Sequence, residues 1–93
     1  MASNQKYRLE LSLKAEKQLS KMDKSVQLFL LEKLEQLEKS PTPLQNAAKL
    51  VNSKNLYRHR FGDYRVIFTL EKDGKIGILL VLKIAHRREV YRP

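Results

Sequence analysis

The stretch that decides the fold covers residues 56–91 and reads LYRHRFGDYRVIFTLEKDGKIGILLVLKIAHRREVY. Turn signals at residues 61–63, Phe-Gly-Asp, and at Asp73-Gly74 divide it into three segments that are rich in apolar residues. These segments predict three strands, over residues 56–61, 64–71 and 76–86. The third segment is almost continuously apolar, which predicts a central strand covered on both faces for much of its length.

The residues before this stretch predict a strand and two helices. Apolar and polar residues alternate over residues 6–11, which is typical of a half-buried strand. Two apolar stripes at helical spacing follow, over residues 13–22 and 24–39. Ser12 and Asp23 are suitable N-caps for these helices, and the short connection between them predicts an antiparallel helical hairpin.

The second helix is expected to end at residues 40–43, Ser-Pro-Thr-Pro, because proline cannot continue a helix. One further helical turn is expected around Ala47 and Ala48. The sequence therefore predicts one α+β domain over residues 1–93. Its N-terminal strand and antiparallel two-helix hairpin pack on a mainly antiparallel four-stranded sheet.

The amino-acid composition and net charge exclude several kinds of functional site and indicate a class of partner. The chain has 93 residues and no cysteine, which excludes disulfides, thiolate metal sites and a cysteine nucleophile. Its polar start and the lack of an apolar run of about 20 residues predict neither a signal peptide nor a membrane span, so we expect a cytoplasmic protein. The formal net charge of +9 implies a polyanionic partner, with nucleic acid or an acidic protein preferred.

The type of cation changes along the chain. Residues 1–50 carry mostly lysine, with Arg8 their only arginine, whereas residues 51–93 carry Arg58, Arg60, Arg65, Arg87, Arg88 and Arg92. Lysine is a solvated point charge, whereas arginine makes planar, bidentate contacts to phosphate. The lysines of the first half are therefore interpreted as solubilising charges, and the arginines of the second half as ligand-binding residues.

Strand alternation places three of these arginines together. If the aromatic residues of the two strands pack on the helices, Arg58, Arg60 and Arg65 gather on the opposite, open face. Such a group of like charges lowers stability, and a chain tolerates it where a polyanion binds. Protection of an edge strand by charge is the alternative. Lys83 either joins this patch or reaches solvent.

Two histidines and a tyrosine complete the candidate site. His59 shares the aromatic face, which indicates a partly buried ring. His86 adjoins Arg87 and follows the last strand, and its neutral form is favoured in a cationic cluster, which suits a base. Tyr91 either stacks on a nucleobase or seals the core as part of a short strand with Val90.

Three segments resemble the RelE branch of the RelE/ParE toxin superfamily: residues 56–60, residues 62–68 (Gly-Asp-Tyr-Arg-Val-Ile-Phe) and residues 85–91 (Ala-His-Arg-Arg-Glu-Val-Tyr). Residues 46–50 also resemble a short family segment. The resemblance implies the toxin of a type II toxin–antitoxin pair that enters the ribosomal A site and cleaves messenger RNA. It implies attack by the 2′-hydroxyl on the adjacent phosphate, with no metal and no cofactor.

The resemblance also assigns roles. Arg65 would stabilise the phosphorane, Arg87 would assist the leaving group, and Tyr91 would stack on or orient the substrate. The best-studied members carry lysines where this chain has Arg58 and Arg60, and arginine is a poor base. The base is thus open between His86, His59 and the ribosome or substrate. The resulting catalytic candidates are Arg60, Arg65, His86, Arg87 and Tyr91, and the RNA-binding candidates are Arg58, Arg60, Lys83 and Arg88.

The expected partners are the ribosome, messenger RNA and a cognate antitoxin, with neither a membrane nor a small-molecule cofactor. The resemblance implies an antitoxin laid across the helical hairpin and sheet. We expect the open apolar groove that it needs to lie around Leu28, Leu31 and the start of the first helix. Two alternatives stay open. One is the ParE branch, which has the same fold but inhibits DNA gyrase. The other is a non-catalytic basic module whose RNA affinity is sensitive to salt.

Overall fold

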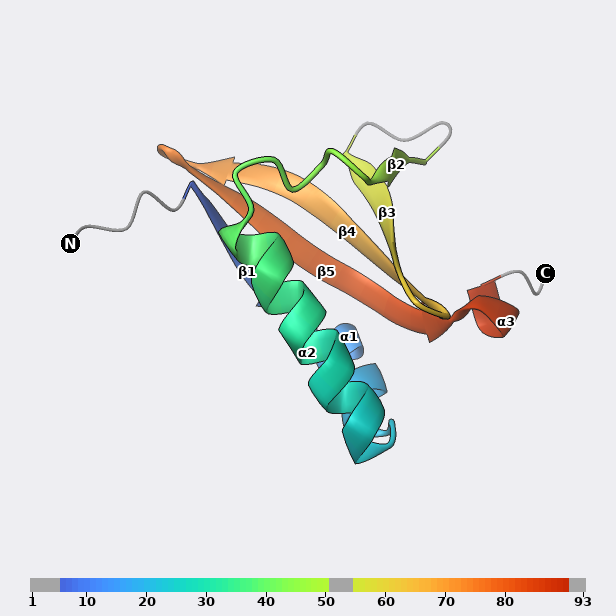
Figure 1. The fold of residues 1–93 in the computed structure, drawn as a ribbon. Helices are drawn as coiled ribbons and strands as arrows, with labels where there is room; N and C mark the ends of the chain where they lie inside the picture. The colour runs from blue at the N-terminus through green and yellow to red at the C-terminus, as the bar shows by residue number, and fades with distance from the viewer. Residues whose placement is uncertain (1–5, 51–54, 91–93) are drawn as a thin grey trace.

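The structure is a computed structural model that describes residues 6–50 and 55–90, so the predictions made for Tyr91 lie outside the described residues (Figure 1). Its elements follow one another as β1 (Tyr7–Leu11), α1 (Leu13–Ser20), α2 (Lys24–Lys39), β2 (Ala48–Lys49), β3 (Leu56–Phe61), β4 (Tyr64–Asp73), β5 (Ile76–His86) and α3 (Arg87–Val90). The predicted strand–helix–helix–strand order is confirmed.

The sheet has the strand order β1-β5-β4-β3-β2, in which β1 pairs with β5 in parallel and the other neighbours are antiparallel. The predicted fold class and the central position of β5 are confirmed, and the described sheet has one strand more than predicted. The additional strand is β2, where Ala48 pairs with Arg58 and Lys49 with Tyr57. The helical turn expected around Ala47 and Ala48 is wrong, because Ala48 takes part in this pairing with β3.

One face of the sheet carries the core. The α1 and α2 hairpin lies against β1 and β5 in Figure 1, and its buried leucines join the inward side chains of the strands. The side chains that meet there with less than 3% exposure include Leu30, Leu34, Val66, Phe68, Leu79, Val81 and Ile84. On the other face, Ile78 and Leu80 of β5 are only half-buried, so the prediction that β5 is covered on both faces is wrong. The cause is that both long helices pack on the same side.

The helix ends follow the predicted capping positions. The Ser12 hydroxyl accepts a hydrogen bond from Ala15 N at 3.1 Å, as an N-cap should. Asp23 occupies the N-cap position of α2 without making a side-chain capping bond. The second helix ends at Lys39, immediately before the Ser40-Pro41 pair. None of the helices in the described parts of the chain has the length and apolar character needed to cross a membrane.

Two tight turns fix the register of the last three strands. Gly62 and Gly74 adopt φ values of 61° and 65°, which glycine reaches without steric cost. A Cβ atom at Gly62 would lie 3.5 Å from the Phe29 ring, so α2 rests directly on the β3–β4 turn. An irregularity between Ile67 and Phe68 then shifts the β4–β5 pairing. At the far end of β5, the chain continues into α3 beside the β3–β4 turn (Figure 1).

Candidate nucleic-acid interface

Four cations lie on the face of the sheet that α1 and α2 leave uncovered. Arg60 of β3 is directly paired with Arg65 of β4, as the turn between them predicts. In the next row, Arg58 pairs with Ile67, which pairs in turn with Lys83 of β5. Side chains in directly opposed positions share one face of a sheet. Lys83 therefore joins the arginines, and we call Arg58, Arg60, Arg65 and Lys83 the arginine patch.

The arginine patch differs from its prediction in one respect. Arg65 is only 3% exposed, whereas the sequence predicted three arginines on an open face. Arg60 is exposed, and Arg58 and Lys83 are half-buried. A like charge in the directly opposed strand position is destabilising, and burial adds the cost of removing a cation from water. Because it is buried, the Arg65 side chain is a fixed cation, whereas the exposed Arg60 stands at the surface of the patch.

His86 belongs to the opposite face. It pairs with Tyr64, whose ring meets the imidazole edge-on with ring centroids 5.2 Å apart. The Nδ1 atom of His86 accepts a hydrogen bond from the backbone N–H of Arg88 at 3.2 Å, so His86 caps the first turn of α3. An accepting Nδ1 places the proton of the neutral ring on Nε2. In this arrangement His86 offers an N–H donor rather than a free basic nitrogen.

Arg87 is held at the end of the sheet by the β3–β4 turn. Its backbone N–H donates to the carbonyl oxygen of Asp63 at 2.7 Å, and its Nε lies 3.8 Å from the Asp63 carboxylate. The two side chains are mostly exposed, so this ion pair contributes little to stability. The turn nevertheless fixes the start of α3 next to Arg60 and Arg65. Arg88 is exposed on the same short helix.

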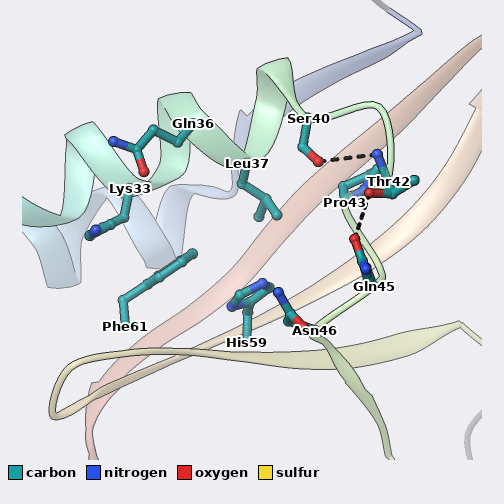
Figure 2. Close-up of a pocket in the computed structure, with 10 residues that line it drawn as sticks. All are labelled: Lys33, Gln36, Leu37, Ser40, Thr42, Pro43, Gln45, Asn46, His59 and Phe61. Atoms are coloured by element: carbon teal, nitrogen blue, oxygen red, sulfur yellow. Dashed lines mark hydrogen bonds between the residues drawn. The ribbon is translucent and has the colours of Figure 1, made fainter.

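His59 lies beneath α2, as the aromatic pattern of β3 predicts. Its ring stacks on Phe61 with centroids 4.6 Å apart, and its buried Nδ1 has no hydrogen-bond partner among the described residues. Burial lowers the pKa of His59 below its ordinary value, and the Arg60 backbone opposes this shift. Figure 2 shows the ring facing a cavity of about 190 Å³ between α2, β3 and the loop that contains Thr42. Ligand pockets usually span about 300–1,000 Å³, so the cavity beside His59 is smaller than a typical ligand site.

The predicted candidates therefore divide between two faces and one end of the sheet. The arginine patch lies on one face, His59 and His86 lie on the other, and Arg87 and Arg88 stand at the end. The sequence predicts only a turn at Asp63, and nothing in its sequence context indicates the hydrogen bond and ion pair that it makes with Arg87. Among the described residues, no three histidine, aspartate or glutamate side chains are grouped so as to hold a metal ion.

Comparison with known proteins identifies the family of this fold. Residues 9–91 match the model of a family described as the ParE toxin of the type II toxin–antitoxin system parDE. None of the curated proteins matches the chain. Since the family model covers most of the sequence, the match extends from β1 through α3.

Solved structures give the same fold. The chain is 31% identical to a chain of the archaeal RelE–RelB complex from Pyrococcus horikoshii, with a TM-score of 0.69 and coverage of 88% of this chain and 96% of that one. The Mycobacterium tuberculosis toxin–antitoxin complex RelBE2 matches at 19% identity and a TM-score of 0.74, covering 87% and 98%. The intact Escherichia coli RelBE complex matches at 24% identity and a TM-score of 0.66, covering 86% and 95%. The last two likenesses bear on the fold alone.

Proposed function

This chain belongs to the ParE toxin family of type II toxin–antitoxin systems, within the RelE/ParE superfamily, and from its 31% identity to a chain of an archaeal RelE–RelB complex we propose that it is a ribosome-dependent messenger RNA endoribonuclease. It is a toxin with the RelE/ParE fold. The proposed reaction takes place in the A site of ribosomes in the cytoplasm. The 2′-hydroxyl of one nucleotide attacks the adjacent phosphate, which yields a 2′,3′-cyclic phosphate and a 5′-hydroxyl.

The observation that carries this proposal is the cross-strand pair of Arg60 and Arg65, one exposed and one buried. Cleavage by a 2′-hydroxyl builds negative charge on the phosphorane, and fixed cations stabilise such charge without having to reorganise. A buried guanidinium meets this requirement better than a mobile surface lysine. Arg58 and Lys83 lie in the adjacent row, where they can hold the flanking phosphates.

Roles for the other candidates follow from their positions. We assign Arg65 and Arg60 to the phosphorane, Arg87 to the leaving oxygen, and Arg88 to a flanking phosphate. With its Nδ1 occupied, the neutral His86 ring can donate a hydrogen bond from Nε2 to the substrate but has no free nitrogen to act as a base. The base then comes from the ribosome or the substrate, and Tyr91 keeps its proposed role of stacking on or orienting the substrate. No cofactor takes part in this scheme.

The decisive experiment uses ribosomes programmed with a defined message, followed by mapping of the 5′ ends. We expect cuts in phase with the codons, and we expect Arg65→Ala to abolish them. Arg65→Lys serves as a second variant, because it keeps the charge but loses the planar fork. Arg8→Ala is the matched control, since Arg8 is exposed on β1, beyond the arginine patch. Unchanged cutting in a folded Arg65→Ala protein would refute the assignment.

A second candidate function is inhibition of DNA gyrase, as in the ParE branch, because the matching family model describes ParE toxins. This function does not require Arg60, Arg65 and Arg87 to converge on one phosphate. An intact message together with blocked supercoiling would replace the ribonuclease proposal with this one. Retention of RNA at low salt, with neither activity, would leave a binding module.

We also propose a cognate antitoxin as the partner, because the similar solved structures include toxin–antitoxin complexes. Three leucines on the helical hairpin are exposed in the isolated chain: Leu13 at 68%, Leu28 at 58% and Leu31 at 45%. Leu28 and Leu31 stand three residues apart on α2 and therefore share one side of it. They offer an apolar strip to an amphipathic helix.

A further inference from the structure

A second basic surface lies on α1, apart from the arginine patch. Lys14 and Lys17 lie in α1, and Lys21 is its C-cap. Because they stand at positions i, i+3 and i+7, the three share one side of the helix, and all are exposed. We call them the lysine stripe. At a rise of about 1.5 Å per residue, the stripe is about 10 Å long. None of its members takes part in an ion pair within the described parts of the chain.

The lysine stripe borders two grooves that join each other. The first has a volume of about 450 Å³ and is lined by Leu13, the three stripe lysines and Gln18. The second has a volume of about 440 Å³ and runs from Gln18 and Lys21 to Tyr64 and His86. Gln18 and Lys21 line both grooves, so a continuous surface leads from the start of α1 to the end of β5.

The unequal lengths of two strands leave this surface open. The pairing of β1 with β5 ends at Leu11 and Val81, but β5 continues to His86. On this uncovered edge, the backbone N–H of Ile84 donates to Oε1 of Gln18 at 2.8 Å. Gln18 is thereby fixed at the junction of the two grooves, and an additional strand is not needed to satisfy Ile84.

The charge of the grooves indicates the class of ligand. Among the described lining residues there is no carboxylate, and Glu16 of α1 falls outside the i, i+3, i+7 pattern of the lysines. Lysine contacts to phosphate supply affinity that does not depend on sequence. A protein partner needs an apolar interface core. Of the exposed leucines Leu13, Leu28 and Leu31, only Leu13 lines these grooves, whereas Leu28 and Leu31 lie together on α2, away from them.

We propose that the lysine stripe and the two grooves bind the phosphate backbone of RNA. This inference rests on the proposed function, because the second groove ends at His86, next to the Arg87 assigned to the leaving oxygen. An RNA strand bound at the end of the sheet, beside His86 and Arg87, would continue along the grooves and contact the lysine stripe. The lysines of the first half of the chain then serve binding as well as solubility.

The test compares two triple variants with equal loss of charge. The first is Lys14→Gln, Lys17→Gln and Lys21→Gln. The control is Lys6→Gln, Lys72→Gln and Lys75→Gln, which removes three exposed lysines at the opposite end of the sheet, where Lys72 pairs with Gly77 and the Gly77 N–H donates to Lys6 O. The probes are ribosomes and a single-stranded RNA with 2′-deoxy nucleotides, which cannot undergo 2′-hydroxyl attack.

We expect the stripe variant to bind the RNA about tenfold more weakly or worse at 0.1 M salt. The slope of log K against log salt should fall by about 2, since each lost phosphate contact contributes about 0.7 on single strands. The control should stay near wild type, with equal melting temperatures for all three proteins. Equal loss in the control, or no loss in either, would overturn the inference.

Measuring antitoxin binding tests the remaining alternative, in which the lysine stripe binds an acidic protein rather than RNA. If the stripe variant loses antitoxin affinity but keeps RNA affinity, the stripe serves an acidic protein and the proposal is wrong. Because the RNA probe cannot be cleaved, binding is measured independently of activity. A wild-type protein that cuts no message yet binds RNA through the stripe would refute the ribonuclease function and leave this inference intact.

Discussion

The two faces of β3 and β4 differ although their residues alternate along the same chain. On the helix side, Val66 and Phe68 are fully buried in the core. On the other side, Arg58, Arg60 and Arg65 gather although like charges repel one another. Because strand side chains alternate, one stretch of sequence supports the fold and the ligand-binding surface independently. The comparison teaches that stability and activity should respond to different members of neighbouring residue pairs.

The largest effect on the helix side is expected at Leu34 of α2, which is 2% exposed in the core. Leu34→Ala should lower the free energy of unfolding by about 2–5 kcal/mol, because it leaves a cavity in the core. Urea unfolding measures the change. Leu31→Ala is the matched control on the same helix, and its exposed side chain should cost less than about 1 kcal/mol. Equal losses would mean that α2 is rotated about its axis.

The sharpest test of the two faces uses adjacent residues. Arg60→Ala should lower ribosome-dependent cleavage about 10²-fold, because one cationic donor to the phosphorane is lost. Its free energy of unfolding should stay within about 0.5 kcal/mol of wild type, since Arg60 is exposed beside another cation. His59→Ala should show the reverse pattern, with a loss of about 1 kcal/mol from the missing Phe61 stack. If both variants lose cleavage alike, the division between the faces fails.

A smaller effect is expected where β1 meets β5. Gly77 pairs with Tyr7, and a Cβ at this position would lie 2.7 Å from the tyrosine ring. Gly77→Ala should therefore lower the free energy of unfolding by about 1–3 kcal/mol through overpacking. In a Tyr7→Val background the same alanine should cost clearly less, because the clashing ring is gone. A cost that does not depend on Tyr7 would point to another cause.

The smallest expected effect is a pH dependence from His59. Burial lowers its pKa from the ordinary 6.5, so the unfolded chain binds the proton more readily than the folded chain. The contribution of His59 to stability is therefore complete above pH 6.5, and it declines as the pH falls through the lowered value. Urea unfolding at a series of pH values measures this slope. His59→Phe should remove it, whereas His86→Phe should keep it.

Local patterns predicted most of the fold. The bounds of α2, β3 and β5 agree with the sequence prediction, because helical periodicity and two glycine turns mark them directly. The short β2 was missed because its two residues have no strand pattern and pair only through the distant Arg58 and Tyr57. The half-buried outer face of β5 was missed for a related reason, since apolar residues alone do not reveal which side the helices cover.

The candidate site was predicted less completely. Alternation was sufficient to place Arg60 beside Arg65, but the burial of Arg65 depends on packing that no local pattern encodes. The hydrogen bond from Arg88 to His86 and the attachment of Arg87 to Asp63 require the path of α3, which the sequence did not predict.

The parallel pairing of β1 with β5 has a consequence for synthesis of the chain. The bond from the Ser12 hydroxyl to the Leu82 carbonyl joins residues that are 70 positions apart. Such non-local contacts form late, because a long loop must first close. Of the described strands, β5 is also the last to be translated. A nascent toxin thus lacks the strand that supports both its core and Arg65 until β5 has been made, so a copy that stops before β5 has neither a stable fold nor an assembled arginine patch.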